Sequence, residues 1–82
     1  MTDLAILAAE TGFKVAGNLS LGLAGAGAGI GVGLVGLGAT QAVGRNPGAF
    51  GNILTIAIIG MALAEAIAIY GLVLALAGLG NA

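Results

Sequence analysis

Two long apolar segments, separated by a short polar break, dominate the pattern of hydrophobic and polar positions along the chain. No charged residue occurs over residues 15–43, and the apolar run over residues 53–79 contains a single charge, Glu65. Each segment is longer than the roughly 20 residues that a helix needs to cross a bilayer. The pattern therefore predicts two membrane-spanning helices, over residues 15–43 and 52–80.

The break between the two segments covers residues 44–51, Gly-Arg-Asn-Pro-Gly-Ala-Phe-Gly. Pro47 disfavours the helical conformation at the preceding Asn46, so the first helix should end there. Arg45 lies near the C-terminus of that helix, where a cation complements the helix dipole. Because a short connection joins antiparallel helices, we expect an all-α membrane protein built as a two-helix transmembrane hairpin.

Residues 1–14 hold three of the five charges of the chain and lack the basic start of a secretory signal. Asp3 suits the beginning of a helix. Glu10 and Lys14 are spaced four residues apart, which is favourable for an ion pair on a helix. We expect an N-terminal surface helical extension, in which a solvated Glu10–Lys14 pair is a simpler interpretation than a functional role for Glu10.

The composition narrows the class of protein further. The chain has 82 residues, of which 60% are hydrophobic and 6% charged, whereas a soluble domain has roughly 25% charged residues. An integral membrane protein with at most two spans is therefore expected. The absence of cysteine and histidine argues against disulfides and transition-metal sites, and two basic residues form no patch for nucleic acid.

One carboxylate lies near the middle of the second apolar run. Glu65 is roughly 18–21 Å along a helix from either end of the run, and an ionised side chain there costs at least about 2.5–3.5 kcal/mol. Arg45 is roughly 30 Å away along a helix and cannot neutralise it. We therefore expect Glu65 to be protonated where it faces lipid and to carry a proton. A purely structural hydrogen bond is more simply made by Ser, Thr or Asn.

Glycine recurs at every second position in the centre of the first span. Gly25, Gly29 and Gly33 form one row, and Gly27 and Gly31 form a second. Because two residues turn a helix by about 200°, the rows lie on nearly opposite faces. Close approach on two faces indicates a row of like helices, which can close into a ring. The alternative is loose packing against the second helix of the same chain, which would use one row.

Taken together, these motifs resemble the c-subunit, the rotor-ring proteolipid of F-type ATP synthases. The carboxylate follows the loop arginine by 20 residues in this pattern. The resemblance covers roughly residues 17–80 and leaves residues 1–14 outside. The motifs that carry it are the glycine run, the Arg45-Asn46-Pro47 loop, Ala64-Glu65-Ala66 and Ile69-Tyr70-Gly71-Leu72-Val73.

The resemblance implies a homo-oligomeric ring in the bacterial cytoplasmic membrane, with the glycine-rich helix inside and the Glu65 helix outside, against lipid. Glu65 would carry the ion past an arginine of the stator a-subunit of the ATP synthase. The loop would face the cytoplasm and contact the central-stalk subunits gamma and epsilon, with both termini on the outer side. The chain would contain no catalytic residue. Charge alone leaves the orientation open, because Arg45 favours a cytoplasmic loop and Lys14 opposes it.

The residues around Glu65 favour H⁺ over Na⁺, and no cofactor is expected. A dehydrated cation needs several oxygen ligands. The positions that help to supply them in sodium-specific members of this family have no side-chain oxygen here; they are Val32, Ala66 and Ile67. The oxygens left are the Glu65 carboxyl, the Leu63 backbone carbonyl and the Tyr70 hydroxyl. Tyr70 has an equally simple interpretation as an aromatic packed on the next hairpin.

Two other functions are considered. One is the related proteolipid of a V-type or A-type rotary ATPase, although those chains often contain fused hairpins. The other is a pore-forming membrane hairpin, which would need no central carboxyl.

Overall fold

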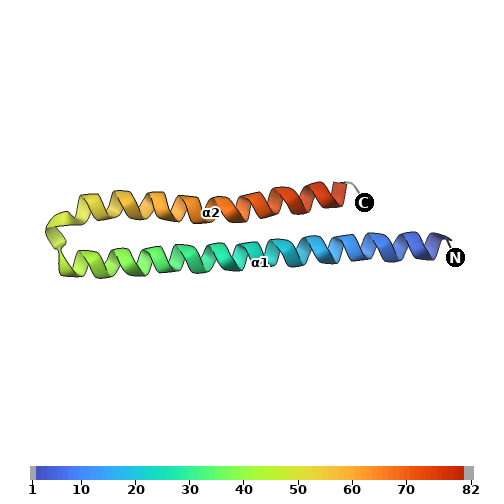
Figure 1. The fold of residues 1–82 in the computed structure, drawn as a ribbon, viewed down its shortest axis with the longest axis horizontal. Helices are drawn as coiled ribbons and strands as arrows, with labels where there is room; N and C mark the ends of the chain where they lie inside the picture. Colours follow the sequence, from blue (N-terminus) through green and yellow to red (C-terminus); the bar gives the residue numbers. More distant parts are fainter. Residues whose placement is uncertain (1, 81–82) are drawn as a thin grey trace.

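The computed structural model describes residues 2–80, which form one antiparallel helical hairpin (Figure 1). The described chain is long and thin, with extents of 69 × 16 × 6 Å. The elements, in order, are α1 (Thr2–Arg45), the short 3-10 helix η1 (Pro47–Ala49) and α2 (Phe50–Gly80). The predicted all-α hairpin is therefore confirmed.

Both long helices are apolar enough and long enough to cross a membrane. With 44 residues, α1 is roughly 66 Å long, about twice the hydrocarbon thickness of a bilayer. With 31 residues, α2 is roughly 46 Å long. Each helix therefore extends beyond the hydrocarbon layer, and α1 extends further than α2.

The turn forms because Asn46 leaves the helical conformation, as predicted from the following proline. Asn46 has φ −143° and ψ 77°. Its N–H donates to the Ala42 carbonyl at 2.8 Å, and the Ala49 N–H donates to the Asn46 carbonyl at 3.0 Å. Pro47 begins η1, where its fixed φ is favourable and its missing N–H has no helical partner to lose.

The non-α-helical part of the turn is narrower than the polar break expected over residues 44–51. The helical geometry of α1 continues through Arg45, and α2 begins at Phe50. Only residues 46–49 lie between the two α-helices, and three of them already form the 3-10 helix η1 that leads directly into α2.

Small residues fill the contact between α1 and α2. Ala28, Ala57 and Ala75 are the buried apolar side chains among the described residues. A Cβ atom built on Gly71 would lie 2.7 Å from the Cβ of Ala24, closer than real Cβ contacts. The two backbones therefore approach each other at this level more closely than a pair of alanines would allow.

The contact follows a seven-residue repeat of small residues, as in a left-handed pair of helices. The repeated positions are Gly17, Ala24 and Gly31 on α1, and Ala57, Ala64 and Gly71 on α2. Glycine contacts fix the register of the pair: Gly17 lies beside Ala75, Gly31 beside Ala64, and Val35 beside Gly60.

The N-terminal end of α1 extends past the described end of α2 (Figure 1). Gly17 is level with Ala75, and Gly80 is five residues further along α2. Residues 2–12 of α1 therefore have no part of residues 50–80 beside them. We call residues 2–12 the overhang.

Candidate ion-carrying site

Glu65 lies near the middle of α2, about 22 Å along the helix from Phe50. Its side chain is exposed on the surface of the single hairpin. Among residues 2–80 of this one chain, the side-chain hydrogen bonds are made by Thr11, Thr40 and Thr55 to carbonyls of their own helices. The hairpin therefore leaves the Glu65 carboxyl available to groups outside the chain.

Glu65 lies on one side of the hairpin, which we call the carboxyl side. Met61 is one turn before Glu65 and packs toward Gly36, where an added Cβ would lie 3.2 Å from the Met61 Cε atom. Gly29 and Gly33 are seven and three residues before Gly36, and residues at these spacings share a helix face. The carboxyl side therefore combines Glu65 with the row that contains Gly29 and Gly33.

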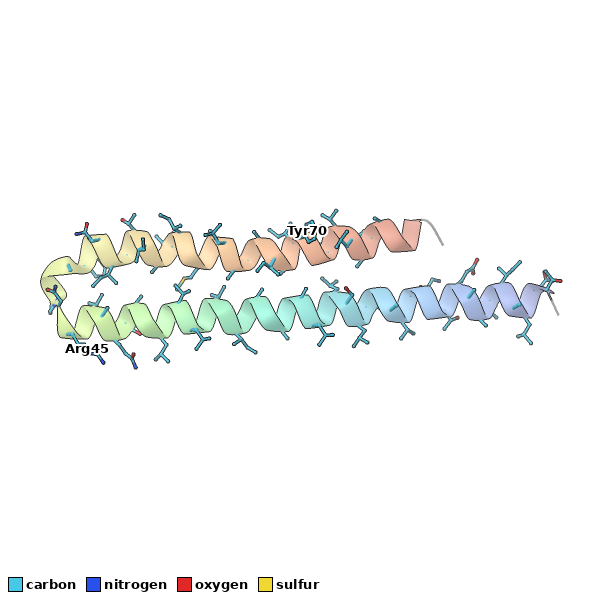
Figure 2. All side chains as sticks on the ribbon, viewed as in Figure 1. Arg45 and Tyr70 are labelled. Carbon is cyan, nitrogen blue, oxygen red and sulfur yellow. The ribbon has the colours of Figure 1, made fainter. Side chains whose placement is uncertain are left out.

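Leu63 and Tyr70 lie on the opposite side, which we call the tyrosine side. The contact between Val35 on α1 and Gly60 on α2 identifies this side, because Gly60 is three residues before Leu63. A Cβ added to Gly60 would lie 3.3 Å from each Cγ atom of Val35. Leu63 and Tyr70 are each 67% exposed, and Figure 2 shows Tyr70 far along α2 from the turn. Five residues turn a helix by about 140°, so Tyr70 does not meet Glu65 within one chain.

The two glycine rows divide between these sides. Gly31 is one turn before Val35 and belongs to the tyrosine side. A Cβ added to Gly31 would lie 3.4 Å from the Cβ of Ala64. For the other four glycines of the run, nothing from the rest of the hairpin lies within 4 Å of an added Cβ: Gly25, Gly27, Gly29 and Gly33. The packing of the hairpin therefore uses one edge of the run and leaves the rest open.

The turn residues Arg45, Asn46 and Pro47 are all exposed at one end of the molecule. Figure 2 shows Arg45 at the turn end of α1, far from Tyr70. Arg45 therefore does not neutralise Glu65 within one hairpin, in agreement with the spacing in the sequence. The turn residues and Glu65 form two separate regions of the molecule.

The glycines that shape the hairpin itself were not predicted from the sequence. Gly17, Gly36, Gly60 and Gly71 each contact the other helix in the structure. The signal for two of them was present as the seven-residue repeat of small residues, but the denser glycine run obscured it. These residues hold the helices at the separation that places Glu65 on an open side.

The geometry defines a class of protein: a membrane proteolipid of two spans whose central carboxyl is open to other copies, to partners or to lipid. The family model for the ATP synthase c-subunit matches residues 15–77. The chain is 52% identical over 62 residues to an ATP synthase c-subunit of Dehalococcoides mccartyi, covering 76% of this chain and 82% of that protein. It is 48% identical over 61 residues to an ATP synthase c-subunit of Chloroflexus aurantiacus, covering 74% of this chain and 80% of that protein.

The chain therefore belongs to the ATP synthase c-subunit family. It is a non-catalytic rotor-ring proteolipid of an F-type ATP synthase, and it translocates ions as part of that membrane assembly. The resemblance seen in the sequence is confirmed, and a V-type, A-type or pore-forming function is not favoured. The family match begins at residue 15, so the overhang lies outside it.

Proposed function

We propose that Glu65 of each copy carries H⁺ through the membrane, in a site completed by the neighbouring copy. The observation that supports this proposal is the exposed Glu65 carboxyl near the middle of the apolar helix α2. In a ring built by one repeated contact, the carboxyl side of one hairpin meets the tyrosine side of the next. The Leu63 carbonyl and the Tyr70 hydroxyl of the neighbour can then approach Glu65, which they cannot do within one chain.

The shapes of the two helices support one arrangement of the ring. α1 has glycines on both sides, so its copies can approach one another closely at a small radius. α2 carries bulky exposed side chains, including Leu63, Ile67 and Tyr70 at 60–67% exposure. α1 on the inside and α2 on the outside, against lipid, is therefore the arrangement that fits both sets of residues.

The transported ion is a proton in this proposal. Val32, Ala66 and Ile67 present no side-chain oxygen, so the oxygens near Glu65 are those of the carboxyl, the Leu63 carbonyl and the Tyr70 hydroxyl. Three groups are few for a desolvated sodium ion, which like other hard cations takes several oxygen ligands. A protonated carboxyl needs a single acceptor for its O–H.

Protonation of Glu65 couples ion flow to rotation. A charged carboxylate entering lipid costs at least about 2.5–3.5 kcal/mol, so each copy turns into the lipid only after it has taken up a proton. An arginine of the stator a-subunit favours release of that proton where the copy returns. Arg45, Asn46 and Pro47, exposed at the turn, would face the cytoplasm and contact the stalk subunits gamma and epsilon, with the termini on the outer side.

Replacement of Glu65 tests its role as the carrier. Glu65→Gln keeps the side-chain volume but cannot release a proton, so we expect an assembled ring and complete loss of proton translocation in reconstituted ATP synthase. Glu10→Gln is the matched control and should leave translocation unchanged. Full activity of Glu65→Gln would exclude Glu65 as the carrier.

Carbodiimide labelling tests the identity of the ion, because carbodiimides modify protonated carboxyls in apolar surroundings. We expect the purified ring to be labelled at Glu65, with labelling that decreases as the pH rises and does not respond to Na⁺. Protection of Glu65 by Na⁺ at constant pH would contradict H⁺ as the ion, while leaving the role of Glu65 as the carrier intact.

A further inference from the structure

The overhang continues α1 without a break, although α2 no longer lies beside it (Figure 1). Three of its apolar side chains, Leu4, Ile6 and Leu7, are 52–65% exposed in the single chain. These exposed apolar side chains form a surface that a partner outside the single hairpin can cover.

The charges of the overhang lie on the face that α2 covers elsewhere. Residues 18 apart occupy the same face, because 18 residues make about five turns. Glu10 is therefore on the same face as Ala28, which is buried against α2, and Asp3 is on the same face as the partly buried Leu21. Beyond the described end of α2, this face of α1 therefore carries the charged residues Asp3 and Glu10.

The two sides of the overhang lie in register with the two rows of the glycine run, although the carboxyl side also carries a large residue, Leu7, five turns before Gly25. Thr11 lies five turns before Gly29, on the carboxyl side, and Ala9 lies five turns before Gly27, on the tyrosine side. The side faces that α1 presents to neighbouring copies therefore continue in register through the overhang.

We propose that the overhangs of neighbouring copies pack side by side as a collar, which extends the inner wall of the ring beyond the outer helices. The partner of each overhang is a second copy of this chain, because the contact is continuous with the ring interface of α1. The carboxyl side at Thr11 meets the tyrosine side at Ala9 of the next copy. Asp3 and Glu10 then face outward, over the end of α2, and remain in water. This proposal rests on the proposed ring with α1 inside.

Disulfide cross-linking tests the collar, and the absence of natural cysteines removes any background. Neighbouring helix axes are about 8–10 Å apart, which brings side chains on facing sides within the roughly 3.5–4.5 Å Cβ separation of a disulfide. We expect oxidised rings of the Ala9→Cys/Thr11→Cys variant to give a ladder of linked copies on a denaturing gel. Asp3→Cys/Glu10→Cys is the matched control on the outward face and should stay monomeric.

Thiol labelling gives a second measurement that requires no cross-link. A bulky water-soluble maleimide should label Glu10→Cys equally in assembled ring and in dissociated hairpin. Thr11→Cys, one residue away, should be labelled at least tenfold more slowly in the ring than after dissociation.

The outcomes separate the collar from the ring on which it depends. Either of two results in assembled rings would overturn the collar and leave the ring intact. One is that the Ala9→Cys/Thr11→Cys pair links no better than the control. The other is that Thr11→Cys and Glu10→Cys are labelled at the same rate. A wild-type chain that forms no ring on size-exclusion chromatography in detergent would overturn both.

Discussion

Two sets of glycines in this molecule differ in what surrounds them. At Gly71, an added Cβ would lie 2.7 Å from the Cβ of Ala24, so α1 and α2 would have to shift to accommodate a side chain there. At Gly29, nothing from the rest of the hairpin lies within 4 Å of an added Cβ. The first set lies where α1 and α2 come together, and the second set is left open by the hairpin and is available for the proposed contact between copies.

The open glycines are not explained by a general preference for small residues on α1. Its face opposite α2 carries large exposed side chains, including Leu23, Ile30 and Leu37 at 55–67% exposure. Glycine is also among the poorest helix formers, at about 1 kcal/mol less favourable than alanine in water. Small residues on the sides of α1 and large ones on its back therefore agree with the proposed ring, in which the sides of α1 face neighbouring copies and its back faces the centre.

The largest effect is expected where a bulky side chain enters the contact between copies. Gly29→Leu should leave the hairpin helical but prevent ring formation or change the number of copies, because overpacking costs about 1–3 kcal/mol at each of the repeated contacts. Circular dichroism measures helix content, and native mass spectrometry measures ring size.

Ala26→Leu is the matched control for that substitution. Ala26 lies three residues before Gly29, near the back of α1 between Leu23 and Ile30, where large side chains already occur. Its rings should keep the wild-type size. If Gly29→Leu and Ala26→Leu rings were equally normal, contact between copies would not explain the glycine row.

A smaller effect is expected within the hairpin at Gly71. Gly71→Ala should lower the stability of the ring by about 1–3 kcal/mol per hairpin, because the two backbones must move apart to accommodate the new methyl group. The double variant Ala24→Gly/Gly71→Ala moves the methyl group to the other helix and should recover most of the loss. The midpoint of ring dissociation in sodium dodecyl sulfate measures both, and a double variant no more stable than Gly71→Ala would contradict the assigned contact.

Much of the fold could be predicted from the sequence because lipid restricts the possible structures so strongly. Two apolar segments of sufficient length permit little besides two helices, and Pro47 sets the position of the turn between them. Glu65 could be singled out for the same reason, as a charge in an apolar run has few explanations. Pro47 gave the end of α1 correctly, whereas the boundary at residue 43 taken from the charge pattern was too early, because Gly44 and Arg45 still complete the last helical turn.

The sidedness of the site could not be predicted in the same way. The distribution of Glu65 and Tyr70 between opposite sides depends on which face of α2 packs against α1, and hence on contacts such as Gly36 with Met61. Apolar residues occur all around α2, so hydrophobic periodicity does not reveal that face. The groups proposed to complete the Glu65 site could therefore be named from the sequence, but the proposal that a neighbouring copy supplies them needed the hairpin geometry.

The smallest expected effect is a difference in stability between alanine variants of two glycines at the α1–α2 contact, Gly60 and Gly36. At Gly60, an added Cβ would lie 3.3 Å from both Cγ atoms of Val35, whose branched side chain has little rotational freedom. At Gly36, it would lie 3.2 Å from the Cε of Met61, the flexible end of an unbranched side chain that can move aside. Gly60→Ala should therefore lower stability by about 1 kcal/mol more than Gly36→Ala, although its contact distance is slightly longer. Val35→Ala should remove this difference, and equal dissociation midpoints for the two single variants would show that side-chain rigidity does not control packing at this contact.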